Sequence, residues 1–449
     1  MAPLTKDYPV FDCDSHVNEL PEAWNYLSVK EKEMVKPYLW PEGSFFVLNG
    51  TQKIPAYWDY GRSGVNWGLR NPKPRIPSSV AATGPGVNKK IIRKLRTMDL
   101  SEEQCQYTDH KGAIDPRARM ADMDLQGIDQ VAVIPVLFFQ GFLFIENIEA
   151  AALLARAYND WIYDWCSVNP QRLFPCAALP VQDPTLAAKE LERVAARGFR
   201  VAALRAVDIK SSYPNQAMYE PMWRAFEETG MVVGMHALPG VRFPKIEESQ
   251  GPWAASFFLD KVINAKQMYG PGGSLGFVHE AMTWITNVLL SGFLERHPKL
   301  TLAIMESNST WLPMVLEECD RAYRLYKNQR RIEVARQPSS IFQEQCFIAF
   351  EGDEEGVYKQ HALYENIGIW SSDVYHHDGA DAWEAIRRMN KLGVPQAAQA
   401  KILGGNANRM YRIEPKMFTT TAPASYPRPD WYPKTEEIER EYASLMRVS

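Results

Sequence analysis

The sequence predicts a TIM-type (β/α)₈ barrel, an α/β fold, with long insertions after the first and fifth strands. Three observations predict it: eight short apolar runs, amphipathic segments between most of them, and polar residues where several runs end. Continuous apolar runs are typical of strands buried on both faces of a parallel sheet, and eight such strands can close a barrel. An open doubly wound sheet is the alternative, but no glycine-rich phosphate-binding motif follows the first run.

The predicted strands and helices alternate along the chain. The strands are expected at 8–14, 130–136, 173–179, 199–205, 231–236, 300–306, 345–350 and 366–373. Segments between them place apolar residues at helical spacing, most clearly at 143–168, 184–197, 218–229, 310–329 and 380–392. Pro184 at the start of one helix and Gly198 after its end are the residue types expected at such boundaries.

Two segments interrupt this alternation. Residues 38–116 are rich in Pro, Gly, Trp and Tyr with little periodicity, and residues 240–277 follow the fifth strand. Long loops in compact domains are typically functional, so we expect both to be lids over the mouth of the barrel. We therefore predict one barrel domain over 1–414 and a C-terminal extension, 415–449, whose length is compatible with a homodimer contact.

The composition narrows the class of partner. The chain has 449 residues, of which 46% are hydrophobic, and a formal net charge of −4, which gives no reason to expect nucleic acid or an anionic membrane as partner. It has no block of Lys and Arg, no apolar run of bilayer length and no secretory signal. Six scattered cysteines without C-x-x-C spacing are typical of reduced thiols. We expect a cytoplasmic protein that acts on a small molecule.

Polar residues at the ends of the predicted strands indicate a metal site. Asp14 and His16 end the first strand, His236 the fifth and Asp373 the eighth, and these ends converge in a barrel. Residues two apart on a strand face the same side, so Asp14 and His16 can both reach the mouth. Two imidazoles and two carboxylates suit one or two Zn²⁺, Fe²⁺ or Mn²⁺ ions, which can ionise a bound water. The alternative is structural: capping aspartates and buried histidines.

Four further residues are candidates for the same site. Glu306, at the end of the sixth strand, is expected to ligate a second ion, to act as a general base, or to pair with Arg205. Arg205 either binds a substrate carboxylate or forms a structural salt bridge. His376 either supports Asp373 or contacts substrate, and His279 either ligates a second ion or caps a helix.

Several stretches resemble the amidohydrolase-related family, which includes aminocarboxymuconate-semialdehyde decarboxylase. They include D-C-D-S-H-V-N-E at 12–19, I-W-S-S-D-V-Y-H-H-D-G at 369–379 and I-L-G-G-N-A-N-R-M-Y-R-I at 402–413, within a likeness that covers about residues 8–413 except the two insertions. The resemblance implies a metal-dependent barrel. It assigns ligand roles to Asp14, His16, His236 and Asp373, and it gives Glu19 a supporting role beside the ligands.

One departure from the family's pattern guides the predicted reaction. Decarboxylases of the family usually carry a histidine at the end of the sixth strand, where this chain has Met305-Glu306-Ser307. Because a glutamate suits hydrolysis, we predict a metal-dependent hydrolase in which a metal-activated water cleaves an ester, thioester or amide. Asp373 or Glu306 would take the proton of the water.

The aromatic insertions indicate a large, partly apolar substrate, from secondary metabolism or aromatic catabolism. The alternative reaction is metal-dependent non-oxidative decarboxylation of an aromatic or enolic acid. A barrel that only binds a partner is the third hypothesis, and the complete ligand set counts against it.

Overall fold

The computed structural model describes residues 3–19, 21–38, 47–48, 52–53, 84–95, 97–108, 111–136, 142, 145, 147–205, 215–237, 271–329, 334–376, 379–426 and 428–445. Much of the predicted insertion at 38–116 and most of that at 240–277 lie outside these residues, so their function as lids stays a prediction. Within 38–116 the structure describes a short antiparallel pair, β2 (Val47–Leu48) and β3 (Gln52–Lys53), and helices α2 (Lys89–Leu95) and α3 (Glu102–Tyr107).

Eight parallel strands form one sheet in chain order, which confirms the predicted (β/α)₈ barrel. They are β1 (Phe11–Val17), β4 (Gln130–Pro135), β5 (Leu173–Ala178), β6 (Val201–Arg205), β7 (Val232–His236), β8 (Leu302–Met305), β9 (Cys346–Glu351) and β10 (Gly368–Ser371). The chain beyond β10 meets β1 again, because the backbone N–H of Asp373 donates to the carbonyl of Asp14 at 3.1 Å. This seam brings the first and last strands together.

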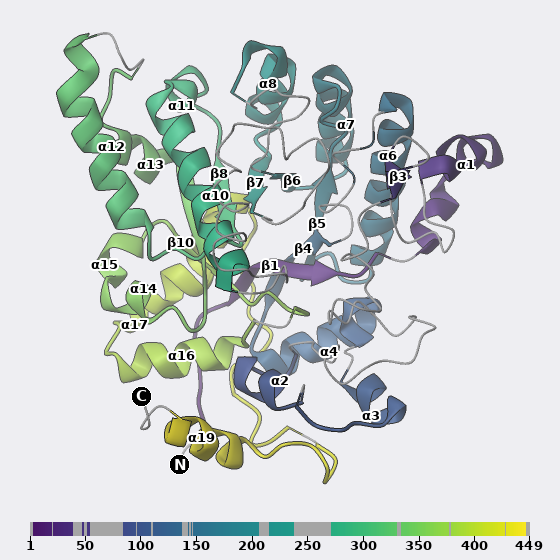
Figure 1. Cartoon of the computed structure of the whole chain (residues 1–449), viewed down its shortest axis with the longest axis vertical. Coiled ribbons are helices and arrows are strands. Elements are labelled where there is room, and N and C mark those ends of the chain that lie inside the picture. The colour runs from purple at the N-terminus through teal and green to yellow at the C-terminus, as the bar shows by residue number, and fades with distance from the viewer. Residues whose placement is uncertain are drawn as a thin grey trace.

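Helices surround the sheet (Figure 1). The longer ones are α4 (Pro116–Gln126), α6 (Ile148–Cys166), α7 (Pro184–Ala196), α8 (Glu220–Thr229), α10 (Pro271–Leu290), α12 (Leu312–Tyr326), α13 (Pro338–Gln345), α16 (Ala382–Lys391) and α19 (Thr435–Leu445). The shorter α-helices are α1 (Val29–Val35), α11 (Phe293–Arg296), α14 (Glu355–Lys359), α15 (His361–Tyr364), α17 (Gln396–Ala400) and α18 (Asn406–Tyr411). Among the described helices, none is both long and apolar enough to cross a bilayer.

Local sequence explains why the helices begin and end where they do. Asp183 precedes Pro184 and its carboxylate accepts the backbone N–H groups of Thr185 and Leu186, so α7 starts with a capped turn. Gly230 ends α8 in the left-handed conformation, with φ of 66°. The apolar faces of these helices pack on the strands and form one large buried core.

A smaller core joins the C-terminal extension to the part of the first insertion that contains α2. Its buried residues come from α2 and its surroundings and from the last part of the chain: Val87, Ile91, Ile92, Leu95, Leu100, Tyr432 and Ile438. Figure 1 shows α19, in yellow, near the N-terminus at one end of the molecule. The extension therefore contacts its own chain, while the predicted homodimer stays a prediction.

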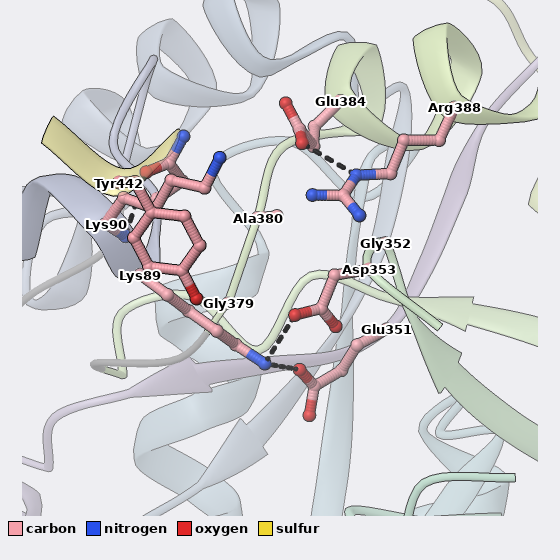
Figure 2. Close-up of a pocket in the computed structure, with 11 residues that line it drawn as sticks. Lys89, Lys90, Glu351, Gly352, Asp353, Gly379, Ala380, Glu384, Arg388 and Tyr442 are labelled. Atoms are coloured by element: carbon pink, nitrogen blue, oxygen red, sulfur yellow. Dashed lines mark hydrogen bonds and ion pairs between the residues drawn. The ribbon is translucent and has the colours of Figure 1, made fainter. Parts of the chain in front are cut away.

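A pocket of about 340 Å³ lies where α2 meets the carboxyl ends of β9 and β10. Figure 2 shows the Nζ of Lys89 between Glu351, at 2.7 Å, and Asp353, at 3.1 Å. The guanidinium of Arg388 on α16 donates to Glu384 at 2.8 Å in the same pocket. We call these five residues the ion-pair pocket, since each cation in it contacts a carboxylate.

Candidate metal centre

The end of β1 delivers two donors because its backbone is irregular. Its pairing with β4 slips between Asp12 and Ser15, so β1 carries one extra residue at this point. A β-bulge of this kind redirects side chains and is common beside active sites. Simple alternation, which the sequence analysis assumed, is thus an incomplete account of how Asp14 and His16 both reach the barrel mouth.

Four side chains form a closed ring of contacts, which we call the donor ring: Asp14, His16, Glu306 and His236. The Nε2 atom of His16 lies 3.3 Å from Asp14 Oδ1 and 3.9 Å from Glu306 Oε2. The Nε2 atom of His236 lies 3.6 Å from Asp14 Oδ2 and 3.4 Å from the same Glu306 oxygen. The four donor atoms all lie within 4.8 Å of one another, as donors around one ion must.

A second group shares two members of the donor ring. His16, Glu306, Asp373 and His376 also bring four donor atoms within 4.8 Å of one another. Asp373 Oδ1 lies 3.2 Å from His16 Nε2 and 2.6 Å from His376 Nδ1. The ring of His376 stacks on that of His16 with centroids 3.9 Å apart. The structure therefore brings together six of the residues that the sequence analysis selected.

Neighbouring groups fix the orientation of the two histidines of the donor ring. His236 Nδ1 lies 2.7 Å from the carbonyl of Ala237, which can only accept, so Nδ1 carries the proton and Nε2 is left as a donor for a cation. The backbone N–H of His16 donates to the carbonyl of Val374 at 2.6 Å. The fully buried Arg119 donates to the His16 carbonyl and to Ser15 Oγ. These contacts hold the donors in position without using their inward-facing atoms.

Burial and crowding make it costly to ionise Asp14 without a cation. Burial raises the pKa of Asp14 to about 8, and the charges of Glu306 and Asp12 add to the rise while His236 opposes it. Burial also acts to raise the pKa of Glu306, but the adjacent imidazoles of His16 and His236 outweigh burial and hold that pKa well below its usual value. A divalent cation would stabilise both carboxylates in their ionised form.

The donor set fits a divalent metal. Both carboxylate oxygens of Asp14 and both ring nitrogens of His16 are buried with no hydrogen-bond partner among the described residues. Such a cost is unusual in a folded protein unless the atoms have another function. Carboxylate oxygens and imidazole nitrogens at this spacing are ligands of Zn²⁺, Fe²⁺ and Mn²⁺.

Three predicted site residues, His279, Glu19 and Arg205, belong to neither of the two donor groups. His279 is on α10, where its carbonyl accepts the hydroxyl of Thr283 at 2.8 Å, and it is in neither donor group found among the described residues. Glu19 is buried just after β1. Arg205 ends β6 and is paired in register with His236, so both side chains leave the sheet on the same face. His377, beside His376, lies outside the described residues.

Sequence reasoning missed the group that holds the seam. Asp12 is fully buried and accepts the backbone N–H of Ser372 at 2.9 Å as well as the Ser372 hydroxyl. It also accepts the backbone N–H of Asp14 at 3.3 Å. Burial raises the pKa of Asp12 to about 6, although the hydrogen bonds from Ser372 oppose the rise. The only sequence signal was a second acidic residue two positions before Asp14.

Known proteins similar to this chain include named decarboxylases. Gamma-resorcylate decarboxylase of Rhizobium sp. (strain MTP-10005) is 25% identical over 312 residues, which are 66% of this chain and 86% of that enzyme. The solved structure of 5-carboxyvanillate decarboxylase from Novosphingobium aromaticivorans, with bound manganese and 3-methoxy-4-hydroxy-5-nitrobenzoic acid, has a TM-score of 0.60 at 16% identity. The structural match covers 91% of this chain and 99% of the Novosphingobium chain.

A third relative extends the likeness of fold. The structure of an amidohydrolase from Mycobacterium avium subsp. paratuberculosis K-10 has a TM-score of 0.63 at 17% identity, covering 90% of this chain and 99% of that one. These similarities agree with the barrel described above. The predicted divalent-metal cofactor is confirmed, as a site for such an ion, by the donor cluster of this chain, and the related Novosphingobium structure holds manganese.

The predicted acyl-bond hydrolysis is wrong. The relatives whose reaction is named are decarboxylases, gamma-resorcylate decarboxylase and 5-carboxyvanillate decarboxylase among them, and none of these supports a hydrolase or a thioesterase. The error came from Glu306, which we took as a sign of water activation. A carboxylate at that position is compatible with metal binding in either reaction, so it does not determine the chemistry.

The match to a family model covers most of the chain and therefore shows its family. The family model described as amidohydrolase matches residues 12–413, from the first donors at the end of β1 to the helix after the last strand. That span includes each residue of the donor ring as well as Asp373 and His376. The chain is therefore an enzyme that belongs to the amidohydrolase superfamily, as the resemblance in its strand-end motifs implied.

Proposed function

We propose that this protein catalyses the non-oxidative decarboxylation of an aromatic carboxylic acid that carries a ring hydroxyl. The observation that carries the proposal is the match to gamma-resorcylate decarboxylase over 86% of that enzyme. The ligand of the related Novosphingobium structure, a hydroxylated and methoxylated nitrobenzoic acid, has the same chemical character. We infer a small aromatic acid as substrate in place of the large acyl compound first expected.

We infer that Asp14, His16, His236 and Asp373 hold a divalent ion, since Asp14 contacts both histidines and Asp373 contacts His16, and the related structure favours manganese. When bound, the ion would supply positive charge to fix an anionic substrate and to stabilise the charge that develops in the ring. Glu19, buried after β1, is inferred to support the ligands, and His279 is inferred to serve its own helix.

Arg205 is inferred to orient the substrate. Its register partner is His236, whose Nε2 is part of the donor ring, so the guanidinium leaves β6 on the face that bears the metal ligands. A guanidinium can hold a carboxylate through two parallel hydrogen bonds. Holding the leaving carboxylate at a fixed angle to the ring plane would favour cleavage of the bond that joins them.

His376 is inferred to move the proton. Its Nδ1 is 2.6 Å from Asp373 Oδ1, and its side chain, 13% exposed against 3% for Asp373, lies at the more open edge of the site. The ring carbon that bears the carboxylate must gain a proton, and the carboxylate then leaves as carbon dioxide while its bonding electrons restore the aromatic ring. An imidazole held by a carboxylate is suited to deliver that proton at neutral pH.

The test is release of carbon dioxide by the manganese-loaded protein from a panel of hydroxylated benzoic acids, including 2,6-dihydroxybenzoate and 5-carboxyvanillate. We expect carbon dioxide and the matching phenol in equal amounts from at least one acid. His376→Gln should lower kcat by about 10²–10⁴-fold, the usual contribution of a positioned proton donor, while manganese stays bound. If the protein binds manganese stoichiometrically and consumes none of the acids in the panel, the proposal is overturned.

A further inference from the structure

We propose that Glu306 is a direct ligand of the metal ion and makes this an oxygen-rich site with three carboxylates and two imidazoles. The inference deepens the proposed function, since it rests on the metal site inferred there. It assigns to Glu306 one of the three functions that the sequence left open.

Glu306 closes the donor ring. Without it, His16 and His236 are joined only through the two oxygens of Asp14, at 3.3 and 3.6 Å. Glu306 Oε2 adds a second bridge, 3.9 Å from His16 Nε2 and 3.4 Å from His236 Nε2. Divalent metals hold oxygen and nitrogen donors at about 2.0–2.2 Å, so neighbouring donors of one ion lie about 3–3.5 Å apart. The contacts of Glu306 come close to that spacing on both sides.

The backbone at Glu306 is held in a conformation that a glutamate rarely adopts. Glu306 has a φ of 50° and Asn308 a φ of 51°, both in the left-handed region. Such a conformation is costly for a residue other than glycine and persists only where the surrounding structure imposes it. Asp373, an inferred ligand, shares this property with a φ of 49°. Glu306 and Asp373 thus both follow their strands where the backbone turns sharply.

A buried carboxylate beside this turn imposes its shape. Glu354 Oε2 accepts the backbone N–H of Ser309 at 2.8 Å and its hydroxyl at 2.9 Å. Glu354 Oε1 accepts the backbone N–H of Glu351 at 2.9 Å, which ties the turn to β9. The indole N–H of Trp311 donates to the carbonyls of Ser307 and Asn308, both at 3.0 Å. The turn after β8 is therefore fixed by side chains that have no part in the donor ring.

The charge balance favours a hard divalent ion. Asp14, Glu306 and Asp373 place three carboxylates around two imidazoles in a buried site. Zn²⁺ in proteins is mostly four-coordinate, whereas oxygen-rich sites with more ligands suit Mn²⁺. We therefore infer that Glu306 sets the preference of the site for manganese over zinc, in addition to contributing affinity.

The test compares Glu306→Gln with the unmodified protein. The dissociation constant for Mn²⁺, measured by isothermal titration, should rise by at least about 10-fold in the variant, since loss of even an outer-sphere partner costs about 10–100-fold. The ratio of Mn²⁺ to Zn²⁺ affinity should fall, and the electron paramagnetic resonance spectrum of bound Mn²⁺ should change. The matched control is Glu351→Gln, which removes the carboxylate at the end of the next strand, where it contacts Lys89.

A crystal structure of the manganese-loaded unmodified protein decides the question even if Glu306→Gln fails to fold. A Glu306 oxygen at about 2.0–2.3 Å from the ion would support the proposal, and one beyond about 3 Å would overturn it. Equal Mn²⁺ affinity and identical spectra for Glu306→Gln and the unmodified protein would also overturn it. Absence of carbon dioxide release in the assay above, with these metal-binding results intact, would count against the decarboxylase and leave the ligand assignment standing.

Discussion

Two groups of charged residues lie at the carboxyl ends of neighbouring strands of this barrel, and they differ in how their charge is balanced. In the ion-pair pocket of Figure 2, Lys89 contacts Glu351 and Asp353, and the side chain of Lys89 is 42% exposed. In the donor ring, Asp14 is fully buried and its neighbours are two imidazoles and another carboxylate. Opposite charges near water balance each other at little cost, whereas buried carboxylates at this density require a cation.

The comparison separates two kinds of charged cluster that look alike in the sequence. Both sets of residues follow apolar runs, and both are rich in Glu and Asp. Only the structure shows that one set meets lysine and arginine from α2 and α16, while the other meets histidine from β1 and β7. Substitutions in each cluster should therefore have different effects on metal binding and on stability.

The largest effect is expected from Asp14→Asn, which keeps the shape of the side chain and removes its charge. Asp14 contacts both ring histidines, so the variant should lose more than about 100-fold in Mn²⁺ affinity, beyond the loss caused by an outer-sphere partner. Metal analysis of purified protein checks this, with Asp353→Asn in the ion-pair pocket as the control. Equal manganese content in Asp14→Asn and the unmodified protein would remove the distinction between the two clusters.

Removal of the metal tests the same distinction through stability. Mn²⁺ at 100 times its dissociation constant should stabilise the folded protein by about 2.7 kcal/mol. For a chain of this size we expect a rise in Tm of about 2 °C or more, because the Tm shift for a given free energy falls with chain length. Scanning calorimetry with and without a chelator measures it, and Asp14→Asn should show no such rise. An unchanged Tm in the unmodified protein would contradict a metal bound to the folded state.

Glu354→Gln tests the carboxylate that supports the turn carrying Glu306. The variant replaces one of the two accepting oxygens by an NH₂ group, so the buried N–H group of either Ser309 or Glu351 loses its acceptor. The free energy of unfolding should therefore fall by about 1–3 kcal/mol. Urea denaturation measures this loss.

The pH dependence of stability in Glu354→Gln has a defined sign. Burial raises the pKa of Glu354 above its ordinary value of 4.5, so the folded state binds more protons than the unfolded state between the ordinary and the raised pKa. The stability contributed by this group is therefore present below pH 4.5 and is lost as the pH rises through that interval. Denaturation at several pH values should show this loss in the unmodified protein and not in the variant. A slope of the opposite sign would contradict the assignment.

The smallest effect is expected from Lys89→Gln in the ion-pair pocket. Exposed ion pairs contribute about 0–1 kcal/mol, so the free energy of unfolding should fall by less than about 1 kcal/mol, and the difference should shrink at high salt. Manganese affinity should not change. A loss of several kcal/mol, or a change in metal binding, would show that the two clusters are coupled.

Much of the fold could be predicted because buried parallel strands leave continuous apolar runs in the sequence. All eight predicted strands have a counterpart in the structure, and helix ends such as that at Pro184 agree to within a residue or two. The start of α10 was not predicted, since Gly272 and Gly273 lie in its first turn and glycine is a poor helix former. Packing in the folded chain overrides that local preference.

From the sequence, only the site residues at the ends of predicted strands could be identified. Asp14, His16, His236 and Asp373 lie at or just after strand ends, and the barrel brings each of them into contact with at least one of the others. The contacts of Asp12 depend on the closure of the barrel, a property of the whole chain. The reaction could not be predicted either, because a carboxylate such as Glu306 has the same appearance in a sequence whether it activates water or binds a metal.

The seam between β1 and β10 has a consequence for how the enzyme is made. Asp12 and Ser372, which join across it, are 360 positions apart, and the donors beside them come from both ends of the barrel. During synthesis, Asp14 and His16 leave the ribosome long before Asp373 exists. With the ligands proposed above, the ion can meet all of them only after the last strand has docked, so metal uptake would report that the nascent barrel has closed.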